Sequence, residues 1–136
     1  MSTSTMETGT EIPTVTATAD RATLVRYAGA SGDFNPLHLD EGFAAGVSPT
    51  GGIIAHGMLA MGLASRAVTA FAGGPEHVLD VQVRFARPWP VDTATTFGGK
   101  VTGIDGDVAT LSLWGDNEDG TRLLRGSAKV RCQRLS

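Results

Sequence analysis

The residues best suited to chemistry lie in the segment ASGDFNPLHLD, which runs from Ala30 to Asp40. Asp33 precedes His38 by five residues, and an Asn-Pro step separates them. Residues five apart do not share a helix face, but an Asn-Pro bend lets both side chains converge on one point. A carboxylate and an imidazole a few ångströms apart hold one water between them, and the imidazole exchanges a proton near neutral pH. Such a pair is suited to adding water across a double bond or removing it.

A purely structural interpretation of the same segment stays open at this point. An aspartate at a helix exit often accepts hydrogen bonds from backbone amides, and Asn-Pro is a common turn. A single histidine among apolar residues is usually a hydrogen-bonded part of the core. Composition alone does not decide between the two roles for Asp33 and His38.

A candidate for binding the substrate carbonyl lies in the segment IAHGMLAMG, where Gly57 begins a long apolar helix. The first N–H groups of a helix lack intrahelical partners and lie at the positive end of its dipole. Glycine lets a carbonyl oxygen approach closely, so the Gly57 N–H is expected to polarise a thioester oxygen, unless this glycine serves packing alone.

Two further residues are candidates for supporting roles. His56 is either a second base or, as we favour, a residue that holds the loop onto the helix start. Ser65 lies eight residues after Gly57, about two helical turns on. It either braces Asp33 or His38 or bonds its own helix backbone.

The rest of the chain predicts an α+β fold. We expect a strand over 12–19, a helix from Asp20 to about Ala28, a short helix from Asp40, and a helix of about 16 residues ending before Gly73. The last of these is apolar on nearly every side, so other elements should wrap it. Four alternating segments follow, with turns near 104–106 and 116–120. An antiparallel sheet wrapped around the long helix is the simplest way to bury both.

Composition sets limits on the function. The chain has 136 residues, a formal net charge of −3 and a single cysteine, Cys132. We expect a flexible tail over 1–11 and one domain over 12–136, in the cytoplasm, with no membrane span and no nucleic-acid partner. Cys132 is expected to fill the core. Asp33, His38 and His56 match no strong metal-ligand spacing, so we expect no metal.

The segments SGDFNPLHLD and IAHGMLAMGLAS together resemble the signature of the MaoC-like, R-specific enoyl-CoA hydratase family, which has the hot-dog fold. The resemblance covers most of the chain, from about Ile12 to the last strand. By position, Asp33 and His38 match the family's catalytic pair, and Gly57 matches the glycine whose N–H meets the thioester oxygen. Asn35 falls on the motif asparagine, and Ser65 on a supporting serine.

The resemblance implies a (3R)-specific hydratase/dehydratase of acyl thioesters on coenzyme A or acyl carrier protein, with no cofactor. It also implies a dimer, either a homodimer or a heterodimer like those of the small dehydratase B subunits of mycolic-acid-type fatty acid synthesis. Five basic residues are expected either to bind phosphates or an acidic carrier protein, or to face only solvent. They are Arg84, Arg87, Arg125, Lys129 and Arg131.

Two competing functions remain at this stage. A hot-dog thioesterase would aim its water at the carbonyl carbon rather than at C3. A non-catalytic subunit would only shape the acyl tunnel of another chain, and the intact motif speaks against it.

Overall fold

The computed structural model describes residues 6–131. In chain order, one strand comes first, the helices follow, and four successive strands complete the fold. They are β1 (Val15–Thr18), α1 (Arg21–Ser31), the 3₁₀ helix η1 (Pro36–His38), α2 (Glu41–Val47), α3 (Gly57–Ala72), the 3₁₀ helix η2 (Pro75–His77), β2 (Val78–Phe85), β3 (Ala94–Asp105), β4 (Val108–Asn117) and β5 (Arg122–Arg131).

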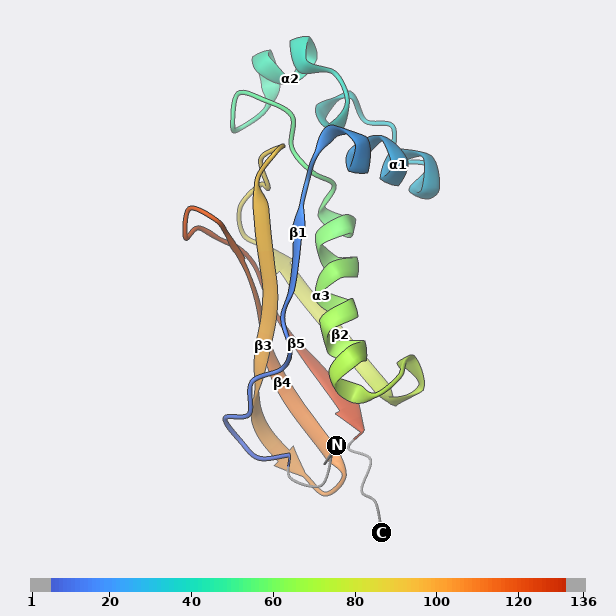
Figure 1. Ribbon diagram of the computed structural model, residues 1–136, viewed down its shortest axis with the longest axis vertical. Helices are drawn as coiled ribbons and strands as arrows, with labels where there is room; N and C mark the ends of the chain where they lie inside the picture. Colours follow the sequence, from blue (N-terminus) through green and yellow to red (C-terminus); the bar gives the residue numbers. More distant parts are fainter. Residues whose placement is uncertain (1–5, 132–136) are drawn as a thin grey trace.

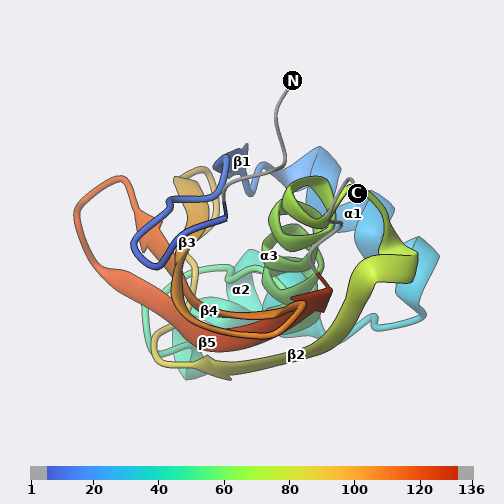
Figure 2. The ribbon, with the colours of Figure 1, turned by 90° about the horizontal axis from the view of Figure 1, so that it is seen from below.

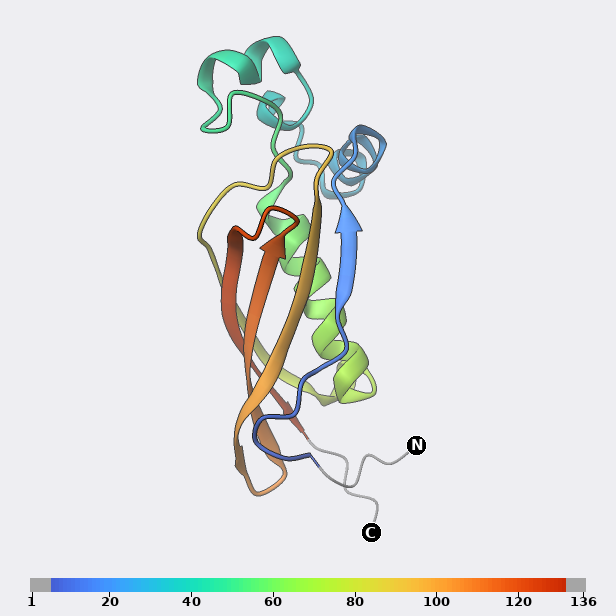
Figure 3. The same cartoon turned by 60° about the vertical axis from the view of Figure 1, so that its left-hand side comes forward.

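The five strands form one antiparallel sheet in the order β1-β3-β4-β5-β2. The sheet curls around α3, which lies against its concave face (Figure 2). Helices α1 and α2 lie together at one end of the molecule, beyond the N-terminal end of α3 (Figures 1 and 3). The predicted α+β class and the wrapped helix are confirmed.

The α3 helix packs on the sheet through small side chains. Ala60, Ala64, Ala67 and Val68 are buried, and these short side chains let the helix lie close to the strands. Gly73 ends α3 in the left-handed conformation, with φ 87°, and its N–H donates to the Thr69 carbonyl.

The opposite side of α3 differs from the expectation of a helix covered all round. Met58, Gly62, Arg66 and Ala70 are exposed, because the sheet of one chain reaches only one side of the helix. Met58 alone is 58% exposed. One long face of α3 therefore has no cover from residues 6–131.

Two aspartates cap the starts of the helices near the site, and the cap at Asp20 was predicted. Asp20 accepts a hydrogen bond from the Thr23 N–H at 2.8 Å, and Asp40 accepts one from the Phe43 N–H at 3.1 Å. The α1 helix runs three residues beyond the predicted end at Ala28. It stops where Gly32 adopts φ 77°.

The N-terminal segment also differs from the sequence-based expectation. Residues 6–11 follow β3 rather than forming part of a flexible tail: the Gly9 N–H donates to the Val101 carbonyl, and the Val101 N–H donates to Thr10. Cys132 lies outside the described residues. Among residues 6–131 no helix is long and apolar enough to cross a membrane.

Candidate active site

The predicted acid–base pair lies just after α1, with Asp33 in the loop that follows the helix and His38 at the end of η1. Asn35 caps η1, since its Oδ1 accepts a hydrogen bond from the Leu37 N–H at 3.0 Å. The Asn35 N–H donates in turn to Asp33 Oδ1 at 3.2 Å. Two successive Asx turns thus bend the chain sharply. Asn35 orients the loop through these bonds rather than by reaching into the pocket.

This bend brings Asp33 and His38 together. Asp33 Oδ2 lies 3.9 Å from His38 Nε2. The side chain of Asp33 is 52% exposed and that of His38 is 11% exposed. The separation is too long for a direct hydrogen bond, but a water about 2.8 Å from each atom fits between them.

The tautomer of His38 follows from its other ring nitrogen. His38 Nδ1 lies 2.6 Å from the backbone carbonyl oxygen of Ile54. A carbonyl oxygen only accepts, so Nδ1 carries the proton and donates. In the neutral ring, Nε2 therefore presents its lone pair toward Asp33, as a general base requires.

His56 is buried directly behind this pair. Its side chain is 2% exposed, and its ring stacks on that of His38 with centroids 3.9 Å apart. Its Nε2–H donates to the Asp33 carbonyl at 3.1 Å, and Tyr27 packs edge-on at 4.8 Å. Within residues 6–131, Nδ1 of His56 has no hydrogen-bond partner. Burial lowers the pKa of His56, and the nearby His38 lowers it further, against the raising effects of the Asp33 carbonyl and charge.

Gly57 lies where α3 begins, as predicted. The N-cap residue, His56, makes no side-chain cap, and no acceptor among residues 6–131 takes the Gly57 N–H. A Cβ at this position would lie 3.3 Å from the ring of Phe85. Gly57 therefore combines an open amide at the positive end of α3 with a close approach to a pocket wall.

Ser65 is the one candidate that the structure does not bring to the pair. It lies two turns along α3, roughly 12 Å along the axis from Gly57. Within residues 6–131, Ser65 forms no hydrogen bond with Asp33 or His38. Spacing along the helix predicted the turn but not the side on which the loop would lie.

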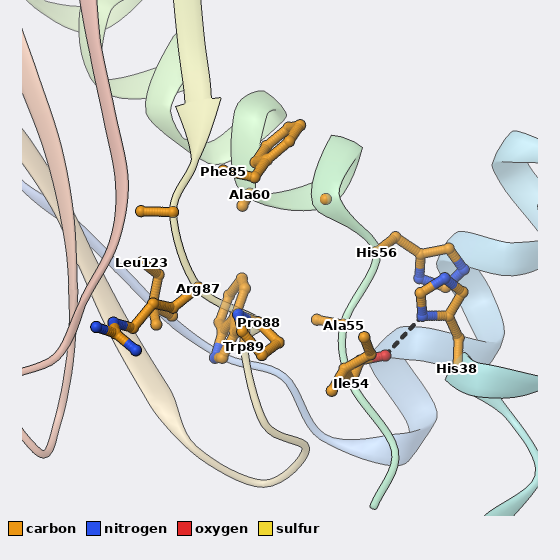
Figure 4. Close-up of a pocket in the computed structure, with 12 residues that line it drawn as sticks. His38, Ile54, Ala55, His56, Ala60, Phe85, Arg87, Pro88, Trp89 and Leu123 are labelled. Atoms are coloured by element: carbon orange, nitrogen blue, oxygen red, sulfur yellow. Dashed lines mark hydrogen bonds between the residues drawn. The ribbon is translucent and has the colours of Figure 1, made fainter. Parts of the chain in front are cut away.

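A pocket of about 280 Å³ opens beside these residues. In Figure 4 the imidazoles of His38 and His56 lie at one side of it, and the bond from His38 to Ile54 is drawn. The pocket is mainly apolar and is lined by His38, Ile54, Ala55, His56, Gly57, Ala60, Phe85, Ala86, Arg87, Pro88, Trp89 and Leu123.

Sequence reasoning missed three of these contributions. The Ile54 carbonyl holds His38, Tyr27 packs on His56, and Trp89 forms a buried wall, with its Nε1–H donating to the Thr93 carbonyl. A tryptophan between two prolines, in the segment RPWP, was the one available signal. No pattern in the sequence marks the carbonyl or the tyrosine.

The side chains of Asp33, His38 and His56 are also close enough together to be considered as ligands of one metal ion. Ligand atoms of Asp33, His38 and His56 lie within 4.8 Å of one another. However, the two imidazole planes are stacked at 24°, so their in-plane lone pairs run side by side and do not converge on one ion. His38 Nδ1 and His56 Nε2 are also already donors to carbonyls. The arrangement suits proton transfer better than metal binding.

Comparison with known proteins decides the family. The MaoC-like domain matches residues 3–112. The chain belongs to this family. A 3-hydroxyacyl-thioester dehydratase Y of Mycobacterium tuberculosis is 33% identical over 108 residues, which cover 69% of this chain. The match covers only 36% of that relative, so this MaoC-like chain spans about a third of its length.

Two further similar proteins match over most of their own length. The 3-oxo-4,17-pregnadiene-20-carboxyl-CoA hydratase beta subunit of Mycobacterium tuberculosis is 28% identical, over 82% of this chain and 86% of its own. The structure of an (R)-hydratase from A. caviae superposes with a TM-score of 0.85 at 29% identity. It covers 94% of this chain and 98% of the hydratase. The predicted hot-dog fold is confirmed by this match.

Proposed function

We propose that this MaoC-like protein is a (3R)-specific hydratase/dehydratase that interconverts 2-enoyl and (3R)-3-hydroxyacyl thioesters. The observation that carries the proposal is the 3.9 Å gap between Asp33 Oδ2 and His38 Nε2 at the edge of an apolar pocket. The names of the related hydratases and dehydratases support the same reaction.

In the hydration direction, one water lies in the gap between the two side chains. It donates one hydrogen bond to the Asp33 carboxylate and one to the Nε2 lone pair of His38. His38 takes a proton as the water oxygen attacks C3 of the enoyl thioester. The carboxyl group of Asp33, which is half exposed, stabilises the imidazolium that forms.

The negative charge that develops on the thioester oxygen meets the N–H of Gly57. This amide has no competing acceptor within residues 6–131 and lies at the positive end of α3. One such donor contributes roughly 3–4 kcal/mol in related oxyanion sites. The pair then returns a proton to C2, and dehydration runs the same steps backward.

His56 and Asn35 act on the pair without touching substrate. His56 fixes the ring of His38 by stacking and holds the Asp33 carbonyl, and Asn35 holds the bend between them. We assign no role to Ser65, because it forms no bond to either member of the pair.

A second hot-dog subunit is part of the proposal. Large apolar side chains are exposed in the loop after α1, in the first turn of α3 and on the edge strand β2: Phe34 (63%), Met58 (58%), Leu79 (45%) and Phe85 (49%). Since β2 ends the sheet, its outer edge is open to pairing with another strand. A matching edge from an identical or related chain would cover these residues. As a separate part of the proposal, the protein acts in the cytoplasm, because a chain with a single cysteine forms no internal disulfide and suits a reducing compartment.

Incubation with crotonyl-CoA tests the reaction type. Mass spectrometry should find the thioester with one water added, and chiral analysis should find the (3R) product. The Asp33→Asn variant serves as the control, because it removes the carboxylate while keeping the size of the side chain. Release of free coenzyme A instead of hydration would identify a thioesterase and defeat the proposal.

A further inference from the structure

Two arginines face each other across the strands that lead to the pocket. Arg84 on β2 and Arg125 on β5 are direct partners in the antiparallel register, and both are exposed. Their chain neighbours Val83 and Leu124 pack into the core, so both arginines lie on the sheet face turned away from α3. Three residues after Arg84, the exposed Arg87 lines the pocket.

The three cations lack the neutralisation found elsewhere on the same sheet. Arg122 forms an ion pair with Asp116 at 2.8 Å, and Arg131 forms one with Asp107 at 2.8 Å. Lys129 lies opposite Asp80 in the register.

By contrast, no carboxylate oxygen among residues 6–131 lies within 4.0 Å of Arg84, Arg87 or Arg125. Like charges placed directly opposite in a sheet are destabilising. A bound anion would offset the repulsion between Arg84 and Arg125. The chain as a whole is acidic, with a net charge of −3, so this group of arginines, unpaired among residues 6–131, is a local exception.

The location separates this cluster from the reacting atoms. Figure 4 shows Arg87 on the opposite side of the pocket from His38, with its guanidinium turned away from the two imidazoles. The cluster therefore suits the portion of a substrate that stays outside the pocket. Guanidinium groups bind phosphate oxygens in pairs and stay charged at every working pH.

The small extent of the cluster favours a nucleotide over a protein. Paired strand positions lie about 5 Å apart. Arg87 follows Arg84 by only three residues, just past the end of β2, where the N–H groups of Ala86 and Arg87 both donate to the Leu123 carbonyl. These spacings match the phosphates of one nucleotide, whereas a stable protein interface covers roughly 800 Å² per partner. We propose that Arg84, Arg87 and Arg125 bind the phosphates of the coenzyme A portion of the thioester, an inference that rests on the proposed function.

Kinetics with two thioesters test this binding site. Crotonyl-CoA carries the nucleotide phosphates, whereas crotonyl-pantetheine carries none. In the Arg84→Gln/Arg125→Gln double variant and in Arg87→Gln, we expect KM for crotonyl-CoA to rise about tenfold with kcat unchanged. KM for crotonyl-pantetheine should stay within twofold of the wild type. Lys100→Gln removes one positive charge, as Arg87→Gln does, at an exposed position on β3; it is the control for that variant and should alter neither KM.

Calorimetric titration with coenzyme A itself separates this site from the reaction, because it needs no turnover. A tenfold weaker affinity in the variants supports the site even if the wild-type protein hydrates no thioester. An unchanged affinity for coenzyme A overturns it, as does an equal rise in KM for both thioesters. A loss confined to crotonyl-loaded acyl carrier protein also overturns it, in favour of a protein partner.

Discussion

The imidazole rings of His38 and His56 stack with their centroids 3.9 Å apart and their planes at 24°. Two imidazolium ions cannot share this contact without strong repulsion, so a proton that enters the stack resides on one ring. Burial and the neighbouring His38 both lower the pKa of His56. His56 therefore stays neutral behind His38, whose ring faces Asp33.

The depressed pKa of His56 predicts how stability depends on pH. In the unfolded chain the ring titrates near 6.5, but in the folded protein it stays neutral to lower pH. As the pH falls through 6.5, the unfolded state takes up a proton that the folded state refuses, so the free energy of unfolding decreases. Urea unfolding of the wild type and of His56→Phe between about pH 7 and pH 5 should show a flatter decline in the variant. Parallel declines would contradict the assignment of His56 as a buried neutral ring.

Two substitutions at His56 separate its stacking from its hydrogen bond. His56→Phe keeps a flat ring over His38 but loses the donor to the Asp33 carbonyl, whereas His56→Gln retains a donor and loses the ring. Each should lower kcat for crotonyl-CoA about tenfold, the equivalent of one hydrogen bond or ring contact, with KM within threefold. The larger loss of kcat identifies which contact, the ring stack or the hydrogen bond, turnover depends on more. A wild-type kcat in both variants would leave His56 with a purely structural role.

Substituting Gly57 tests the amide at the start of α3. In Gly57→Ala the new Cβ meets the Phe85 ring at 3.3 Å, so the ring must shift or the helix start must move. Since the substrate oxygen must approach this amide closely, we expect kcat/KM to fall at least tenfold. Adding Phe85→Leu should restore part of it by making room.

Gly29→Ala provides the control for this substitution. Gly29 lies inside α1 with nothing within 4 Å of a new Cβ. Alanine there should stabilise the protein by about 0.5–1 kcal/mol and leave kcat/KM unchanged. Equal losses of activity in both variants would mean that the effect at Gly57 is not specific to the site.

The buried side chain of Asn117 predicts a stability effect without a large effect on chemistry. Its Nδ2 donates to Thr93 Oγ1 at 2.8 Å and to Thr95 Oγ1 at 3.2 Å, and Thr93 in turn accepts from Trp89 through its backbone. Asn117→Ala removes these bonds and should cost about 2 kcal/mol in urea unfolding. Because Trp89 walls the pocket, KM should rise modestly while kcat holds. A loss of kcat beyond tenfold would show that this network reaches the reacting groups.

The sequence predicted the elements better than their arrangement. Alternating residues located β2 to β5, and the capping aspartates Asp20 and Asp40 located the starts of α1 and α2, because these signals act over a few neighbouring residues. The contact of His38 with the Ile54 carbonyl joins residues 16 positions apart, and nothing in the local pattern marks an acceptor on the backbone. The bare side of α3 was missed for a similar reason: an apolar helix indicates burial but not whether its own chain supplies the cover.

Residue types and one motif located the candidate site residues in the chain, but they did not predict all of their contacts. Asp33, His38 and Gly57 lie at the pocket or beside it, as the bend at Asn-Pro and the helix start implied. The supporting role of Ser65 was predicted partly from its position along α3. Helix spacing does not show on which side of the helix the loop with Asp33 and His38 lies. The stacking of His56 on His38 required the fold itself, since 18 residues separate the two rings in the chain.

The turnover of crotonyl-CoA by Asp33→Asn and by His38→Ala, beside the wild type, tests most directly whether this carboxylate and this imidazole handle the reacting water. General acid–base groups typically contribute 10²- to 10⁴-fold, so each variant should lose at least a hundredfold in kcat while its urea midpoint stays close to that of the wild type. If either variant, correctly folded, hydrates crotonyl-CoA within tenfold of the wild-type rate, the reaction does not depend on the pair.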